Sequence, residues 1–460
     1  MTNGTRTTCT VAVLLAVSAL PAPATATAAD TSHIEGQLPS GAAYMMDVPA
    51  DWNGTVLLFS HGYRPQGSPS TAQNASDNTT KSLLLQRGYA LIGSSYASNG
   101  WAVTDAVPDQ LATLSVFTDR FGTARRTIAW GQSYGGLVTT ALAERAPQHF
   151  DGSLSMCGLV HGGVANWNNT LDPVFALKTL LAPDSAIPLV DIPDRTAATD
   201  AANTLTAAVD SAQTTAEGRA RIALAAALHN IPGWNDPSQS RPAETDWAGQ
   251  EANQYTALKG LVQLPAFSWR LEAETRAGGN MSWNTGVDYA RLLGQSSVRK
   301  EVGALYKQAG LSLRKDLATL NKAPRIGADP SAVAWMSGTS AFTGKLTKPQ
   351  LDIHTIGDAL VPVQTESALK RAVNAAGSSR LLRQAYVDNA GHCTFSPAEQ
   401  LGALHTLEDR IGTGKWPSTD AASLNSRATE AHSTTPARYV TYRPAPYPRP
   451  YDLAHPADGR

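Results

Sequence analysis

Short apolar runs alternate with amphipathic segments over the first third of the chain. Five of these runs have the length of a β-strand: 42–49, 55–60, 89–97, 127–130 and 152–160. Between them, most clearly over 104–122, apolar residues recur every three or four positions, as on a helix with one buried face. Strands separated by helices of this length predict parallel βαβ units and an α/β fold.

The pattern changes after residue 160. From 161 to 346, alanine-rich helical stretches dominate, such as 200–230 and 301–321, and four tryptophans lie between them: Trp234, Trp247, Trp269 and Trp283. We interpret this region as a mainly helical cap inserted into the α/β unit. Its tryptophans would form either an apolar pocket for a substrate or the core of the insertion itself.

The alternation of strands and helices resumes behind the insertion. In order, the pattern predicts a strand at 350–356, a helix at 362–377, a strand at 380–387 and a helix at 396–414. The last helix has a complete start signal, with Ser396 as cap, Pro397 at the first helical position and Glu399 closing a capping box. The Ser-, Thr- and Pro-rich tail beyond 416 is expected to end in an extended segment without a core of its own.

The N-terminus has the three zones of an export signal. Arg6 supplies the positive charge, residues 11–20 are apolar, and small residues precede a cleavage site after Ala28 or Ala29. The apolar zone is too short to span a bilayer, and no other stretch is long and apolar enough. We expect a secreted, soluble protein with this organisation: signal peptide 1–29, α/β core 30–160 and 347–416, helical cap 161–346 and tail 417–460.

The composition bears on which classes of molecule the protein binds and on whether its cysteines form a disulfide. The formal net charge is −1 and 16 % of the residues are charged, so there is none of the basic excess that a nucleic-acid partner would require. Removal of the signal leaves two cysteines, Cys157 and Cys393. In an oxidising compartment such a pair is a candidate disulfide, and two buried thiols are the alternative.

Residues 131–135, GQSYG, fit the pattern G-x-S-x-G between a predicted strand and a predicted helix. Ser133 would occupy a strained turn, so its neighbours must be small, and Gly131 and Gly135 would let the strand and the helix pass closely. The amide end of the helix lies under the serine oxygen and favours developing negative charge. Ser133 is therefore the candidate nucleophile.

A serine nucleophile needs a base that a third group holds in place. Asp358 directly follows the strand 350–356, and His392 lies in the loop after the last strand, so both reach the edge of the sheet where catalytic groups collect. Asp352 and Asp388 are weaker rivals for the acid. His354 lies within the strand, which favours a role in the core or behind the site.

The segment SHGY ends the strand 55–60 and predicts the oxyanion hole. Its donors would be the backbone N–H groups of Tyr63 and Tyr134, with Gly62 permitting close approach of a carbonyl. A plain turn at the strand end is the alternative. Three further side chains near strand ends are candidates for the lining of the pocket: His61, Tyr96 and Trp101.

The segments SHGY, GQSYGG, IGDALVP and AGHC, in this order, resemble the α/β-hydrolase superfamily over nearly all of the mature sequence. The serine motif is similar to that of secreted esterases and of prolyl-oligopeptidase-type peptidases. The resemblance implies a nucleophilic serine, a covalent acyl-enzyme, a helical cap after the sixth strand, and neither a metal ion nor an organic cofactor. It does not fix the substrate.

One family of feruloyl esterases and tannases has a cysteine just before the serine, joined to one just after the histidine. Cys393 follows His392 here, but Gln132 stands before Ser133, so half of that pattern is missing. Cys157 ends the strand after the helix that follows Ser133, at the same sheet edge. We therefore hypothesise a Cys157–Cys393 bond.

These features favour a secreted carboxylic ester hydrolase acting on a small-molecule or peptide acyl substrate. A serine peptidase or amidase is the alternative within enzymes. A peptidase that binds the free amino terminus of its substrate needs acidic residues in the cap, and Glu272 and Glu274 are candidates. An alternative of another class is a catalytically inactive hydrolase fold that binds the cell envelope through its tail.

Overall fold

A computed structural model describes residues 1–2, 31–434 and 436–451. Almost all of the predicted signal peptide, 1–29, and the last nine residues of the tail lie outside this part of the chain. Among the described residues, no helix has the length and the apolarity that crossing a bilayer requires.

The core is one twisted sheet with the strand order β1-β2-β4-β3-β5-β6-β7-β8-β9. The strands are β1 (Thr31–Gln37), β2 (Ala43–Pro49), β3 (Thr55–Ser60), β4 (Ala90–Ser94), β5 (Arg126–Gln132), β6 (Gly152–Met156), β7 (Gln350–Gly357), β8 (Leu382–Ala390) and β9 (Tyr439–Val440). Strands β4, β3, β5, β6, β7 and β8 run parallel, and β1, β2 and β9 add antiparallel edges. The predicted α/β fold is confirmed.

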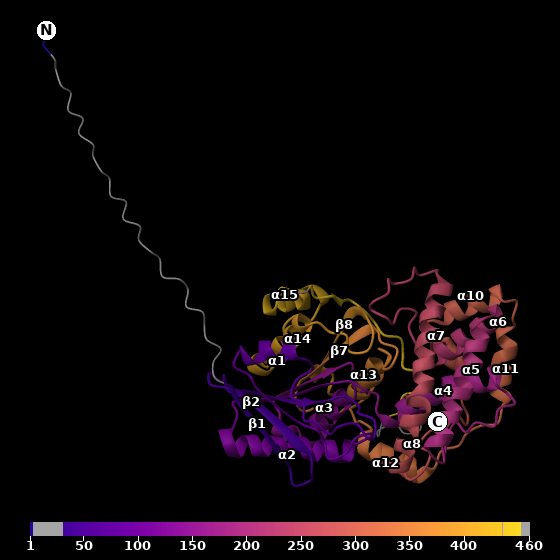
Figure 1. The fold of residues 1–460 in the computed structure, drawn as a ribbon, viewed down its shortest axis with the longest axis horizontal. Helices are drawn as coiled ribbons and strands as arrows, with labels where there is room; N and C mark the ends of the chain where they lie inside the picture. Colours follow the sequence, from indigo (N-terminus) through magenta and orange to yellow (C-terminus); the bar gives the residue numbers. More distant parts are fainter. Residues whose placement is uncertain (3–30, 435, 452–460) are drawn as a thin grey trace.

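Helices cover both faces of the sheet (Figure 1). They are α1 (Asn78–Leu85), α2 (Val103–Phe121), α3 (Tyr134–Arg145), α13 (Thr365–Ala375), α14 (Pro397–Thr413) and α15 (Ala421–Ala431), with short 3-10 turns at Pro147–His149 and Ser379–Leu381. Successive strand residues point to opposite faces. On β3, Leu58 packs in the apolar cluster with α2 and α3, while Leu57 packs in the cluster with α1, α14 and α15.

A lobe of helices, residues 163–340, is inserted between β6 and β7 and lies beside the sheet (Figure 1). Its helices are α4 (Gly163–Leu181), α5 (Arg195–Gln213), α6 (Ala216–His229), α7 (Trp247–Gln263), α8 (Arg270–Ala277), α9 (Tyr289–Gln295), α10 (Arg299–Gln308), α11 (Leu313–Lys322) and α12 (Pro330–Ser340), with a π-helical turn at Pro265–Trp269. This helical lobe has an apolar core of its own, rich in alanine and leucine. The helical stretches 200–230 and 301–321 each divide into two helices, because Thr215 and Ser312 cap new ones.

The segment beyond 416 holds more structure than its composition predicted. It forms α15 and pairs β9 with β8, and residues 441–451 then run without helix or strand onto the helical lobe. There Arg449 Nη1 lies 3.0 Å from Asp172 Oδ2 on α4, and both side chains are buried. The expectation of an extended end without a core of its own is compatible with residues 441–451, but the composition did not predict that this end packs against the helical lobe.

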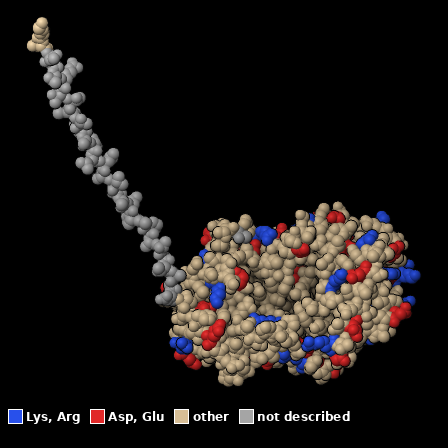
Figure 2. Space-filling view, viewed as in Figure 1, with Lys and Arg blue, Asp and Glu red and all other residues tan. Residues whose placement is uncertain are grey.

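The surface carries both signs of charge. Figure 2 shows Lys and Arg interspersed with Asp and Glu on the face drawn, and a hollow between the sheet and the helical lobe.

Candidate active site

Ser133 occupies the sharp turn between β5 and α3. Its backbone has φ 58° and ψ −126°, a left-handed conformation that costs about 1–3 kcal/mol for a residue with a side chain. A Cβ on Gly135 would collide with the carbonyl oxygen of Ser60, and a Cβ on Gly131 would lie 2.7 Å from the same oxygen. The strand and the helix can therefore approach closely only because both positions are glycine.

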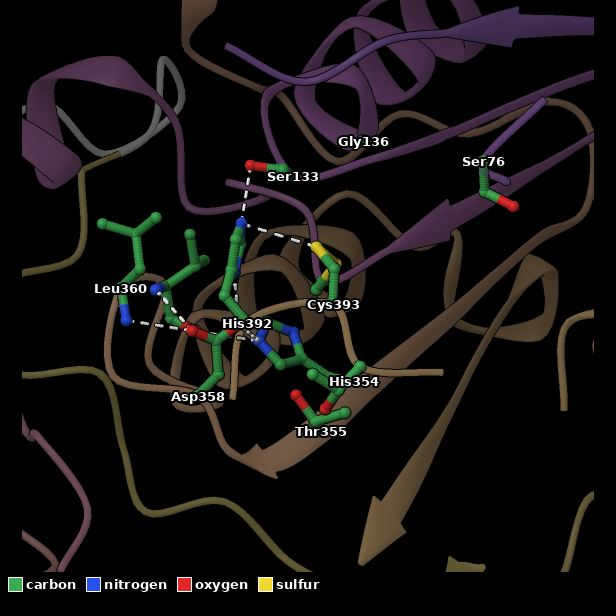
Figure 3. The surroundings of a disulfide bond; sticks show 12 residues. Ser76, Ser133, Gly136, His354, Thr355, Asp358, Leu360, His392 and Cys393 are labelled. Carbon is green, nitrogen blue, oxygen red and sulfur yellow. Dashed lines mark hydrogen bonds and ion pairs between the residues drawn. A yellow bond between two sulfur atoms is a disulfide. The ribbon is translucent and has the colours of Figure 1, made fainter. Parts of the chain in front are cut away.

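Asp358, His392 and Ser133 form one chain of hydrogen bonds (Figure 3). His392 Nδ1 lies 2.6 Å from Asp358 Oδ2, and His392 Nε2 lies 2.7 Å from Ser133 Oγ. With Nδ1 donating to the carboxylate, Nε2 is free to accept the proton of the serine hydroxyl. The structure thus brings together the three residues that the sequence singled out.

The carboxylate of Asp358 is fully buried and well supplied with donors. Its Oδ1 accepts hydrogen bonds from the backbone N–H groups of Leu360 and Val361, both at 2.9 Å. Burial alone would raise the pKa of Asp358, but the imidazoles of His392 and His354 outweigh it and lower that pKa to about 2. Asp358 is an anion at any physiological pH.

The rival acids lie elsewhere. Asp352 is buried within β7, where it accepts from Gln350 at 2.9 Å. Asp388 is on the surface and pairs with Arg241 at 2.9 Å. Neither carboxylate contacts His392, so Asp358 is the acid that the fold presents to this imidazole.

Two backbone N–H groups flank Ser133. The loop after β3 passes over the serine, so that a Cβ on Gly62 would lie 3.6 Å from Ser133 Cβ and 3.9 Å from its Oγ. Among the described residues, the N–H groups of Tyr63 and Tyr134 have no backbone acceptor, and Tyr134 is the first residue of α3, where a helix leaves its N–H groups free. This is the arrangement expected of an oxyanion hole.

A disulfide joins Cys157 and Cys393, with the two Cα atoms 5.4 Å apart. The hypothesised pairing is confirmed and the alternative of two thiols is wrong. Cys393 follows His392, and its Sγ lies 3.4 Å from His392 Nε2. These two cysteines and His392 form the cluster of potential metal ligands found in the described part of the chain, but sulfurs in a disulfide supply no thiolate.

A cavity of about 200 Å³ opens beside Ser133 and His392. Most of its wall is apolar or aromatic: Tyr63, Trp101, Tyr134, Leu159, Trp167, Leu261, Pro265, Trp269, Leu360 and Val361. Of the predicted pocket residues, Trp101 lines this cavity, and His61 and Tyr96 do not. The last two are buried below it, stacked on each other at 3.9 Å, where Tyr96 donates to the carbonyl oxygen of His61.

The helical lobe supplies wall residues that sequence reasoning missed, such as Trp167 and Leu261. Their helical spacing is also that of ordinary core residues, so no signal in the sequence marked them. Of the four tryptophans that the sequence analysis singled out, Trp269 reaches the cavity and Trp283 is buried in the core. Trp234 and Trp247 line a separate groove of about 530 Å³.

Glu272 and Glu274, the candidates for binding a substrate's amino terminus, form hydrogen bonds and ion pairs with other groups of the protein. Glu272 accepts from the backbone N–H of Trp101 at 2.8 Å and pairs with Arg276. Glu274 pairs with Arg270 at 3.4 Å. Neither carboxylate lines the cavity beside Ser133.

Comparison with known proteins yields one family. Residues 91–397 match the model of the alpha/beta hydrolase fold. The o-phthalyl amidase of Xanthobacter agilis is 29% identical over 429 residues, which cover 88% of this chain and 93% of that protein. Feruloyl esterase B from Aspergillus oryzae is similar over 84% of this chain and 80% of its own, with 16% identity and a TM-score of 0.39. An acylaminoacyl peptidase of Pyrococcus horikoshii is similar over 84% of this chain and 42% of its own, with 11% identity and a TM-score of 0.37.

Proposed function

The chain belongs to the alpha/beta hydrolase fold family, and from this premise we propose that it is a serine hydrolase that cleaves a carboxylic ester through Ser133, His392 and Asp358. One observation carries the proposal: the unbroken hydrogen-bond chain from Asp358 through His392 to Ser133 Oγ. A serine hydroxyl held against an imidazole whose other nitrogen is fixed by a carboxylate is activated for attack on a carbonyl carbon.

The reaction would proceed in two halves. Ser133 Oγ forms a bond to the acyl carbon while its proton passes to His392 Nε2, and the N–H groups of Tyr63 and Tyr134 bind the oxyanion. The imidazolium then gives the proton to the leaving group as the bond to it breaks. In the second half, water gives a proton to His392 and bonds to the acyl carbon. The bond from this carbon to Ser133 Oγ then breaks, the imidazolium returns the proton to Oγ, and the acid is released. Each oxyanion donor is worth about 3 kcal/mol of the barrier.

The cavity indicates the acyl group. Its wall of tryptophan and tyrosine rings, with aliphatic residues between them, suits a flat aromatic acyl group, because ring contacts add to the free energy of apolar burial. The helical lobe would act as the cap of the site, since Trp167, Leu261 and Trp269 contribute to this wall.

An amide is the second candidate substrate. The observation that favours it is the match to the o-phthalyl amidase over most of both chains. An aminopeptidase is less favoured, because Glu272 and Glu274 are held by Arg276 and Arg270 and neither lines the cavity.

We further propose that the protein is exported and that residues 1–29 are its signal peptide. The support is the three-zone pattern of that segment together with the Cys157–Cys393 disulfide, since such bonds persist in oxidising compartments.

The test is a substrate panel with Ser133→Ala as the blank. The panel contains p-nitrophenyl benzoate, p-nitrophenyl acetate, N-benzoyl-p-nitroanilide and an aminoacyl-p-nitroanilide. We expect hydrolysis of the benzoate, its loss in Ser133→Ala, and labelling of the wild type alone by a fluorophosphonate. A wild type that hydrolyses none of the four and takes no label would refute the proposal and favour a binding role.

A further inference from the structure

A second histidine, His354 on β7, contacts Asp358 from inside the protein (Figure 3). Its side chain is fully buried. Its Nε2 lies 2.8 Å from the carbonyl oxygen of Val361 and 3.5 Å from Asp358 Oδ2. Its Nδ1 lies 2.9 Å from Glu366 Oε1 on α13. Each ring nitrogen therefore faces oxygen atoms that accept hydrogen bonds.

A neutral imidazole has one N–H group and cannot donate at both nitrogens. It would leave a lone pair directed at an oxygen less than 3 Å away. The proton could instead lie on Glu366 Oε1, but Glu366 Oε2 accepts from Gln384 Nε2 at 2.6 Å, and such a donor favours the ionised carboxylate. The better place for an extra proton is Asp352, because burial and the neighbouring charge of Glu366 raise the pKa of Asp352 well above its usual value.

We propose that His354 is an imidazolium in the resting protein and acts as a positioning residue, which holds Asp358 and the turn up to Val361 and offsets part of the negative charge facing His392. The buried group then contains one cation, His354, between two anions, Asp358 and Glu366. Such pairing is what allows charges to remain in a protein interior. Part of this inference, its effect on turnover, rests on the proposed function.

The surroundings of His354 agree with this assignment. Burial lowers the pKa of an imidazole, but hydrogen bonds to Asp358 and Glu366 outweigh it and raise the pKa of His354 to about 10. His161, after β6, is the cationisable group on the other side, and it is neutral because burial lowers its pKa to about 3.

The charge of His354 has a kinetic consequence. His354 Nε2 and His392 Nδ1 lie 3.5 and 2.6 Å from the same oxygen, Asp358 Oδ2, so these two nitrogens are at most about 6 Å apart. At about 6 Å a unit charge shifts a pKa by about 0.5 to 2 units, depending on the effective dielectric constant. Loss of the cation leaves more negative charge beside His392 and makes its protonated form more stable. The acid limb of the pH profile, where His392 must lose its proton to act as base, then moves to higher pH.

The kinetic test compares kcat/KM between pH 4 and 10 for the wild type, His354→Gln and His161→Gln. We expect the acid limb of His354→Gln to move up by about one pH unit. His161→Gln removes an equally buried but neutral imidazole and should leave the limb in place. A residue that served packing alone would lower kcat without moving the limb, and that result would overturn the proposal.

The direct test uses nuclear magnetic resonance of wild-type protein with isotope-labelled histidine, with the His354 signal assigned as the one missing from His354→Gln. We expect both ring nitrogens of His354 to be protonated from pH 6 to 8. In Glu366→Gln, the imidazolium should lose one of these protons at a lower pH than in the wild type. A single N–H in the wild type at pH 7 would refute the proposal. If His354→Gln fails to fold, Glu366→Gln supplies the assignment by its shift. An inactive wild type with a protonated His354 would refute the proposed function alone.

Discussion

Cys393 is bonded to Cys157 and directly follows His392, so a covalent link to the end of β6 anchors the loop that carries the imidazole. The other end of the His392 ring is fixed by Asp358. The disulfide thus belongs to the machinery that keeps Nε2 within 2.7 Å of Ser133 Oγ, as well as to the stability of the fold.

Removal of the disulfide should lower both stability and turnover. For Cys157→Ser/Cys393→Ser we expect the free energy of unfolding to fall by about 2–4 kcal/mol, since the unfolded chain loses a cross-link. We also expect kcat to fall more than KM rises, because the His392 loop is released. Urea unfolding and steady-state kinetics measure the two effects. A reductant should lower the stability and the kcat of the wild type but not those of the double variant. Equal losses in both proteins would contradict the role given to the disulfide.

Asp358→Asn should cost about 10³- to 10⁴-fold in kcat, because the amide neither holds the productive tautomer of His392 nor stabilises its charged form. Asp388→Asn, which alters the surface rival paired with Arg241, should keep wild-type activity. The pair is compared in kcat/KM on p-nitrophenyl benzoate. Equal effects of the two changes would exclude Asp358 as the acid.

Gly135→Ala should destabilise the protein by about 1–3 kcal/mol or more, since the new Cβ would collide with the Ser60 carbonyl oxygen. The matched change is Gly303→Ala, on α10, where a Cβ meets no atom within 4 Å. That variant should gain up to about 1 kcal/mol from better helix propensity. Thermal and urea unfolding should therefore move in opposite directions for the two variants.

Three histidines should make the fold sensitive to mild acid. Burial lowers the pKa of His61 to about 4, of His161 to about 3 and of His229 to about 4. Each is neutral in the folded protein, whereas the unfolded chain takes up a proton below about pH 6.5. The stability that these three neutral rings contribute is therefore full above pH 6.5 and is lost as the pH falls from there towards 4.

Urea midpoints at pH 7, 5.5 and 4 measure this loss. His161→Gln should flatten the dependence, because one proton fewer distinguishes the folded from the unfolded chain. Midpoints that stay constant from pH 7 to 4 in the wild type would contradict a neutral, buried state of these rings.

Leu261→Trp should fill part of the cavity beside Ser133. We expect kcat/KM for p-nitrophenyl benzoate to fall about 10-fold or more, while p-nitrophenyl acetate is hydrolysed nearly as before. Leu264→Trp is the control, since Leu264 is 49% exposed, three residues further along, and does not line this cavity. Equal losses on both esters would indicate a distorted site instead of a smaller pocket.

Much of the core and of the site could be predicted because both follow local rules. Ser133 and Asp358 come directly after a strand and His392 two residues after one, and the carboxyl ends of parallel strands meet at one edge of the sheet. The wall of the cavity could not be predicted, because Trp167 and Leu261 come from helices whose docking is set by three-dimensional packing. For the same reason His61 and Tyr96 were misplaced: a strand end does not tell whether a side chain points into the cavity or below it.

The edges of the fold escaped prediction for a related reason. Strand β9 has two residues, too few to show any alternation, and it exists because β8 offers a free edge. Helix α15 lies in a Ser- and Ala-rich stretch whose apolar positions matter only once α14 is present to pack against.

The Asp172–Arg449 pair joins residues 277 positions apart. Burial raises the pKa of Asp172, and the guanidinium of Arg449 opposes that effect. A chain made only as far as β9 would lack this guanidinium, and the buried acid would keep only the hydroxyl of Tyr289, at 3.3 Å, and the charge of Arg325. We therefore expect the lobe to reach its full stability only when Arg449 has docked, although its last helix ends more than a hundred residues earlier. The segment that carries Arg449 thus docks on the lobe after Ser133, Asp358 and His392 have all been synthesised.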